Sequence, residues 1–218
     1  NLDKEFKVIS IDSLKFDYKN NRNVQNQLYI KRNDRNYTIK GSNFDASKMI
    51  NNIMDSEKKD SSIFQNLNSK INIELDKTYI DKINFIKNLT GNLSFEKNKI
   101  KDLNLKSIFA NNKKIELSIS TNDKQEQITK LFTGFPEPLV KRYGFIKGFE
   151  EGYLNFYSIK KNKISNSILV IDNFKVKEVP VFAKLLSLAS LQGIADLLTG
   201  EGIRFTDFEM KFSNKKGL

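Results

Sequence analysis

The 218-residue chain contains no cysteine, no histidine and no tryptophan, and only three prolines. Without cysteine it can form neither a disulfide framework nor a Cys-ligated metal site. Without histidine it lacks the commonest general base and metal ligand. Five acidic residues of its C-terminal part show no spacing typical of a glycosidase pair or a calcium site. They are Glu150, Glu151, Glu201, Asp207 and Glu209. The sequence therefore predicts a protein that is not an enzyme and holds no metal or cofactor.

The sequence also lacks an initiator Met, a signal peptide and an apolar run long enough to span a bilayer. Its first residues lie within a strand-like pattern, and its last residues closely follow another. We therefore expect a fragment of a longer protein, and we expect residues 1–218 to form a single β-rich module of it. The missing targeting signals then give no reason to expect the cytoplasm.

Arginine is scarce, because only five of the 37 basic residues are Arg, whereas asparagine occurs 26 times. An excess of Lys, Asn and Ile is typical of an AT-rich genome, so the net charge of +11 is weak evidence for a nucleic-acid partner. No RNA-binding motif is present either, and we expect no nucleic acid. A basic balance favours contact with anionic surfaces such as phospholipid head groups. Solvated Lys on outward strand faces is the simpler interpretation.

Apolar and polar residues alternate with a period of two along most of the chain, which predicts short antiparallel strands joined by polar turns. A short helix capped by Asp45 or Ser47 is expected to bury Met49, Ile50 and Ile53. Residues 127–144 resemble a helical interlude. The strand-like runs occupy residues 14–18, 28–30, 37–39, 71–75, 83–86, 91–95, 100–109, 115–120, 152–160, 165–179 and 203–212.

A dense apolar run at 181–198 predicts a pair of short helices, near residues 180–199. At 3.6 residues per turn, the apolar stripe of the first half falls on roughly the opposite face in the second half. One straight helix cannot bury both stripes, so we expect a break between Ser190 and Gly193. The residues expected to pack the pair are Phe182, Leu185, Leu188, Leu191, Ile194 and Leu198.

Four segments, in order, resemble the AsmA-like superfamily of Gram-negative envelope proteins (YhdP/TamB-like), in its C-terminal region. The strongest is FKVKEVP followed by GEGIRF, within 174–205. The others are KGSNFDASKMINNI, KINIELDKTYIDKINFIKNLTGNLSFEKNKIKDLNLKSIF and FPEPLVKRYGFIKGFEEGYLNFYSIK. The third departs from the family pattern, because Glu151-Gly152 replaces paired glycines and Thr133-Gly134 replaces an aspartate-glycine.

The resemblance implies a mainly β fold, in which an antiparallel meander forms a curved, taco-like or groove-shaped sheet. It implies a periplasmic segment, anchored to the inner membrane through a part outside this chain, that carries phospholipid between the inner and outer membranes. The implied partners are phospholipid acyl chains, with envelope protein partners unknown. A non-transport structural or assembly factor for outer-membrane biogenesis, with the same architecture, is the alternative.

Residues on single faces of alternating strands are the candidates for a lipid groove. An ordinary sandwich core is the competing interpretation of these apolar faces, and the resemblance favours the groove. We expect most of the candidates to point into one shared concave or buried surface. They are Ile71, Ile73, Leu75, Leu154, Phe156, Phe208, Met210 and Phe212.

Overall fold

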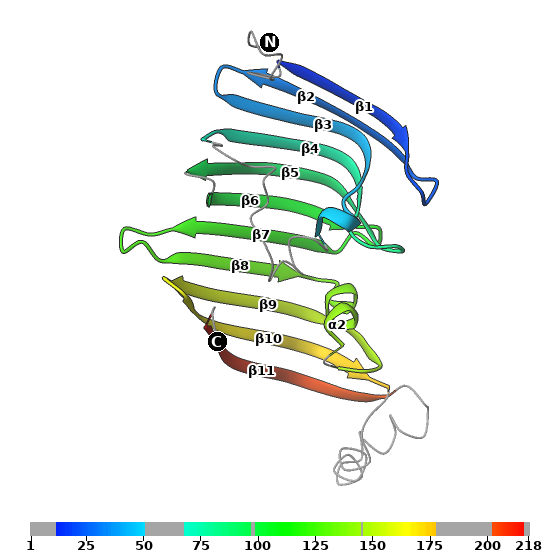
Figure 1. Cartoon of the computed structure of the whole chain (residues 1–218). Helices are drawn as coiled ribbons and strands as arrows, with labels where there is room; N and C mark the ends of the chain where they lie inside the picture. Colours follow the sequence, from blue (N-terminus) through cyan, green and yellow to red (C-terminus); the bar gives the residue numbers. More distant parts are fainter. Residues whose placement is uncertain (1–11, 51–67, 97–98, 145, 178–201, 216–218) are drawn as a thin grey trace. The chain divides into compact units, whose positions relative to one another are not determined.

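The structure, a computed structural model, describes residues 12–50, 68–96, 99–144, 146–177 and 202–215. Eleven strands and short helical segments make up most of these ranges, which confirms the mainly β fold (Figure 1). The chain divides into two compact units. The first unit comprises Asn1–Asn112 and Glu116–Thr121, and the second comprises Lys113–Ile115 and Asn122–Leu218. The single module expected over 1–218 stays a prediction.

In the first unit the strand order follows the chain order. Strands β1, β2 and β3 pair antiparallel, as do β4, β5 and β6. The strands are β1 (Ser13–Lys19), β2 (Gln25–Asn33), β3 (Asn36–Asp45), β4 (Lys70–Tyr79), β5 (Phe85–Glu96), β6 (Lys99–Phe109) and β7 (Lys114–Thr121), the last lying mostly in this unit.

One pair of this unit departs from the expected antiparallel pattern. Strands β3 and β4 run parallel, with Tyr37 opposite Ile71 and Gly41 opposite Leu75. Parallel neighbours require a crossover of a dozen or more residues, which a hairpin turn cannot supply. The long connection between Asp45 and Lys70 provides it.

The second unit comprises β8 (Gln127–Thr133), α2 (Glu137–Tyr143), β9 (Phe149–Lys161), β10 (Ile164–Val176) and β11 (Ile203–Lys215). Its strands also follow chain order, and β8–β9, β9–β10 and β10–β11 are antiparallel. The helical interlude expected at 127–144 is therefore only partly right, because residues 127–133 form a strand. Helix α2 has Pro138 in its first turn and ends at Gly144, whose left-handed φ of 64° suits glycine.

Three strands contain a non-glycine residue with positive φ within the strand: Asn88 in β5, Glu151 in β9 and Asn173 in β10. Asparagine tolerates the left-handed region better than most residues. At Asn88 and Asn173 the buried residues change parity along the strand. In β10, for example, Leu169 and Ile171 are buried before Asn173, and Phe174 and Val176 are buried after it. The kinks therefore redirect the apolar face within a continuous strand.

The short helix expected after β3 begins at Ser47. The carboxylate of Asp45 accepts the N–H of Ser47 at 3.1 Å, and the N–H of Ile50 donates to the carbonyl of Ala46 at 2.9 Å. Burial of Met49 was a wrong expectation, since 48% of this residue is exposed. Ala46 and Ser47 are buried instead.

The helix pair expected at 180–199, its break and its six packing residues lie outside the described residues, as does Ile53. They stay predictions. Among the residues that the structure does describe, no helix is long and apolar enough to cross a membrane.

Candidate functional site

The strand register of the second unit places five of the eight groove candidates on one face of β9, β10 and β11. Leu154, Ile171 and Phe208 lie opposite one another in one row across the three strands. Phe156, Leu169 and Met210 form the next row, and Ser158, Ser167 and Phe212 form the third. Residues directly opposite in an antiparallel pair share a face. The five candidates, Leu154, Phe156, Phe208, Met210 and Phe212, are therefore brought together.

This apolar face is buried at one end and increasingly open toward β11 and the β9–β10 hairpin. Leu154 and Ile171 are 3% and 0% exposed, and Val140 of α2 is buried in the same cluster. Phe156, Phe208 and Met210 are half-buried, and Phe212 is 41% exposed. The rings of Phe156 and Phe212 lie 6.4 Å apart between centroids. The described residues thus leave a contiguous, partly uncovered apolar surface beside a solid core.

Beyond the kinks, the strands are held together by three stacked rings. The ring of Phe174 lies between those of Phe149 and Phe205, with centroids 5.3 and 5.2 Å away and interplanar angles of 23° and 12°. Gly152 permits this arrangement, because a Cβ there would lie 2.9 Å from Cβ of Phe174 and 2.8 Å from the carbonyl oxygen of Asp172. The stack anchors the closed end of the apolar face.

Polar groups near the apolar face are paired with one another. The hydroxyl groups of Ser158 and Ser167 lie 2.9 Å apart and are buried in the third row. On the opposite face, Lys175 and Arg204 contact the carboxylate of Glu151 at 3.2 and 3.3 Å. The hydrogen bond from Lys175 is the main cause that lowers the pKa of Glu151. Charge is therefore segregated from the apolar surface.

The remaining three candidates lie on one face of β4 in the first unit. Ile71 and Leu75 are buried and Ile73 is half-buried, opposite Leu93, Leu89 and Gly91 of β5. The alternation predicted their common face correctly. Because they belong to a different unit from the other five, the shared surface expected for all eight stays a prediction.

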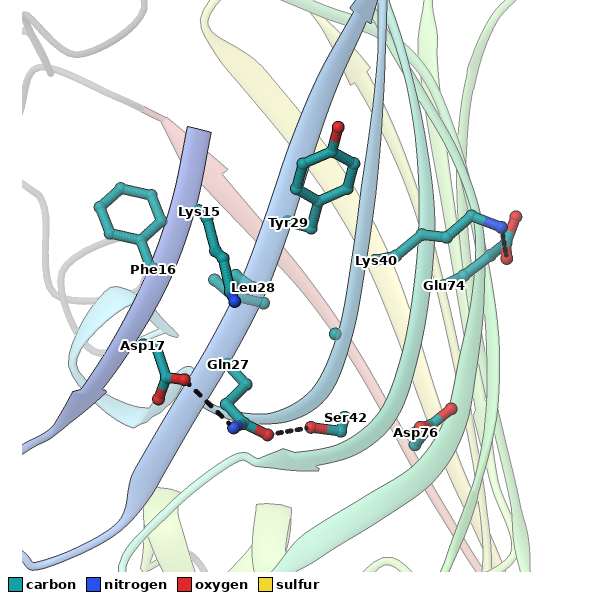
Figure 2. A pocket seen from close by; sticks show the side chains of 11 residues that line it. Lys15, Phe16, Asp17, Gln27, Leu28, Tyr29, Lys40, Ser42, Glu74 and Asp76 are labelled. Atoms are coloured by element: carbon teal, nitrogen blue, oxygen red, sulfur yellow. Dashed lines mark hydrogen bonds and ion pairs between the residues drawn. The ribbon is translucent and has the colours of Figure 1, made fainter. Parts of the chain in front are cut away.

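The first unit also carries an open pocket of about 660 Å³ that sequence reasoning missed (Figure 2). Most of its lining residues are polar or charged. The ammonium of Lys40 contacts Glu74 at 2.7 Å, and Ser42 donates to Gln27, which donates to Asp17 at 3.4 Å. Gly41 lets two strands meet there, since a Cβ would lie 2.3 Å from the carbonyl oxygen of Gln27. The full lining is Lys15, Phe16, Asp17, Gln27, Leu28, Tyr29, Lys40, Gly41, Ser42, Glu74 and Asp76.

One end of the first unit is held by a charged cluster around Asp45, whose side chain is 5% exposed. Its carboxylate contacts the guanidinium of Arg22 at 2.9 Å and accepts a hydrogen bond from Asn20 at 2.6 Å. Arg22 also donates to the backbone carbonyls of Asp81 and Lys82. Burial alone would raise the pKa of Asp45, but the hydrogen bonds from Ser47 and Asn20 and the charge of Arg22 together lower it.

Comparisons of the chain with protein-family models, curated proteins and solved structures yield no match. Within the described ranges, no group of three or more acidic side chains is placed to hold a metal ion.

Proposed function

We propose that the apolar face of β9, β10 and β11 binds phospholipid acyl chains. In this proposal the chain is a periplasmic segment of an inner-membrane-anchored, bridge-like protein that carries phospholipid between the inner and outer membranes. The observation that carries the proposal is that Phe156, Phe208 and Met210, half-buried, and Phe212, exposed, surround the buried Leu169 on one strand face. Soluble proteins rarely leave such a patch uncovered without a partner for it.

The chemistry of this face suits acyl chains better than a polar ligand. The three rows across β9–β11 contain aliphatic and aromatic side chains and no charged residue. Their two hydroxyl groups already pair with each other. Each acyl CH₂ removed from water gains about 0.8 kcal/mol, so burying about five of them supplies roughly 4 kcal/mol. A surface of this kind holds many lipids without selecting one head group.

Photocrosslinking at neighbouring residues on opposite faces tests the proposal. A photoreactive amino acid replaces Phe156 or Met210 on the apolar face, and Asn155 or Glu209 on the polar face as matched controls. Each variant of the chain is irradiated with vesicles of phosphatidylethanolamine and phosphatidylglycerol, and the adducts are identified by mass spectrometry. We expect phospholipid adducts at Phe156 and Met210 and a background level at the two controls.

Equal labelling of both faces would contradict the proposal, because it would show that the chain contacts vesicles without preference for its apolar face. An absence of adducts at all four positions would also contradict it. Both results would favour the alternative, a structural or assembly factor for the outer membrane.

A further inference from the structure

Strand β11 is the last strand in the sheet order, and among the described strands it has one neighbour, β10. It is 13 residues long. An edge strand of this length presents a row of backbone N–H and C=O groups that can pair with another strand. Proteins usually blunt such edges with charged side chains, proline, bulges or very short strands. Strand β11 contains no proline, and its charged residues include the oppositely charged Glu209 and Lys211.

The side chains of β11 are self-complementary when the strand is paired antiparallel with its own copy about Met210. In this register Glu209 of each copy lies opposite Lys211 of the other, so two ion pairs form. Phe208 of each copy lies opposite Phe212 of the other, and the two Met210 side chains meet at the centre. Opposite charges and aromatic pairs directly across two strands stabilise a sheet, whereas like charges destabilise it.

We propose that β11 is the interface of a two-fold symmetric dimer, in which the β11 strands of two copies pair antiparallel with Met210 on the axis. Three of the four nearest registers that keep the same faces together are disfavoured by charge. Centring the pair on Glu209 or on Lys211 places that residue opposite itself. Centring it on Phe208 places Asp207 opposite Glu209. The fourth, centred on Phe212, sets no like charges opposite each other, but it forms one aromatic pair where the register about Met210 forms two.

The exposure of these residues fits this occupant. Within one chain, Lys211 and Glu209 already contact each other at 2.7 Å, with 67% and 50% of their side chains exposed. They are therefore free to exchange this contact for one with a second copy. On the other face, Phe212 is 41% exposed, and Phe208 and Met210 are half-buried. Pairing covers these three side chains and continues the apolar face from one copy onto the next. This inference does not depend on lipid binding.

A single introduced cysteine reports the register, because the chain has no cysteine of its own. In the Met210→Cys variant the two thiols lie on directly opposite residues, about 5 Å apart, and a short thiol–thiol crosslinker gives a covalent dimer. Thr206→Cys on the same strand is the control. Its two thiols are eight positions out of register, or about 26 Å apart, and we expect no crosslinked dimer. Equal crosslinking of both variants, or none with Met210→Cys, would overturn the proposal.

Charge reversal provides a second test that does not depend on the stability of one chain. Glu209→Lys alone sets Lys opposite Lys211, and Lys211→Glu alone sets Glu opposite Glu209, so both variants should sediment as monomers. An equimolar mixture of the two restores both ion pairs and should sediment as a heterodimer. The double variant in one chain should dimerise like the unaltered chain. Failure of the mixture to associate would overturn the interface. An unaltered chain that stays monomeric while its concentration is raised about 100-fold would also overturn it.

Discussion

The two units share a way of bending their strands but are held together by different chemistry. In the first unit, Arg22 and Asp45 join the β1–β2 turn to the ends of β3 and β4 through ion pairs and hydrogen bonds. In the second unit, the rings of Phe149, Phe174 and Phe205 stack beyond the kinks. One unit is thus closed by a polar cluster and the other by an apolar one.

This difference separates two properties of the molecule. The polar cluster makes the stability of the first unit sensitive to pH, because its carboxylates must stay ionised. The stacked rings of the second unit carry no titratable group, and the residues beside them provide the apolar surface that we propose as the ligand-binding face. The shared kinks, by contrast, should respond alike to substitution in both units.

Removal of a core side chain from the second unit should give the largest effect. Ile171 is fully buried, and Ile171→Ala should lower the free energy of unfolding of this unit by about 4 kcal/mol, through lost apolar contacts and the cavity left behind. Hydrogen exchange read by mass spectrometry resolves the two units separately. Ile164→Ala on the same strand is the control, because Ile164 is exposed, and it should cost under about 0.5 kcal/mol. Similar losses for both variants would show that the apolar cluster is not the core of this unit.

Removal of the central carboxylate should destabilise the first unit almost as strongly. Asp45→Ala leaves Arg22 without its buried partner and should lower the free energy of unfolding of that unit by about 3 kcal/mol. Glu74→Ala is the matched control, since the Lys40–Glu74 pair is exposed on both sides and such pairs contribute under about 1 kcal/mol. If Asp45→Ala lowers the free energy of unfolding as little as Glu74→Ala does, the polar cluster does not stabilise the first unit.

The same cluster predicts the direction of the pH dependence. The pKa of Asp45 is below its ordinary value of 3.8 in the folded chain. Its contribution is therefore complete above pH 3.8 and is lost as the pH falls through the lower folded value. The pKa of Asp81 is lowered as well, mainly by hydrogen bonds from Asn84 that outweigh its burial. We expect acid to destabilise the first unit more than the second, and Asp45→Asn to reduce this acid sensitivity. Equal acid sensitivity of the two units in hydrogen exchange would contradict this expectation.

Substitution at the kinks should give the smallest effect, and a similar one in each unit. Asn88 and Asn173 are exposed and have φ of 53°. A β-branched residue is strained at such an angle, so Asn88→Val and Asn173→Val should each cost about 1–2 kcal/mol. Glycine at the same positions should be tolerated, because it lacks a Cβ. A valine variant as stable as its glycine counterpart, judged from thermal unfolding by circular dichroism, would show that the kink imposes no strain.

The sequence predicted the strand faces well, because a period of two fixes which side chains share a face irrespective of how strands pair. For this reason it placed Leu154 and Phe156 on one face of their strand, and Phe208, Met210 and Phe212 on one face of theirs. It did not predict the parallel pairing of β3 with β4, since alternation carries no information about strand direction. It also predicted a helix that begins at residue 127, whereas residues 127–133 form β8. Pro136 and Pro138 indicate where the helix begins, which is after this strand.

The kinks and the polar cluster could not be predicted from the sequence pattern, for a different reason. Asn88 and Asn173 are two of 26 asparagines in the chain. Because asparagine is so common here and is compatible with ordinary turns, its presence at these two positions did not indicate a kink within a strand. The contact between Arg22 and Asp45 joins residues 23 positions apart, and only the fold brings them together. The scarcity of arginine was the one sequence feature that could have drawn attention to Arg22, because the chain has only five arginines.

The most direct test of the ligand-binding face compares one charge on each side of the same strand. Phe156→Asp and Asn155→Asp add the same carboxylate at adjacent residues on opposite faces of β9, and circular dichroism confirms that both variants stay folded. Each variant is titrated with a phospholipid that carries a fluorescent acyl chain. A buried charge is costly to desolvate, so Phe156→Asp should weaken binding at least about tenfold, equivalent to 1.4 kcal/mol, while Asn155→Asp should bind like the unaltered chain. Equal affinity of the two variants, or no binding by the unaltered chain, would contradict the proposed role of this face.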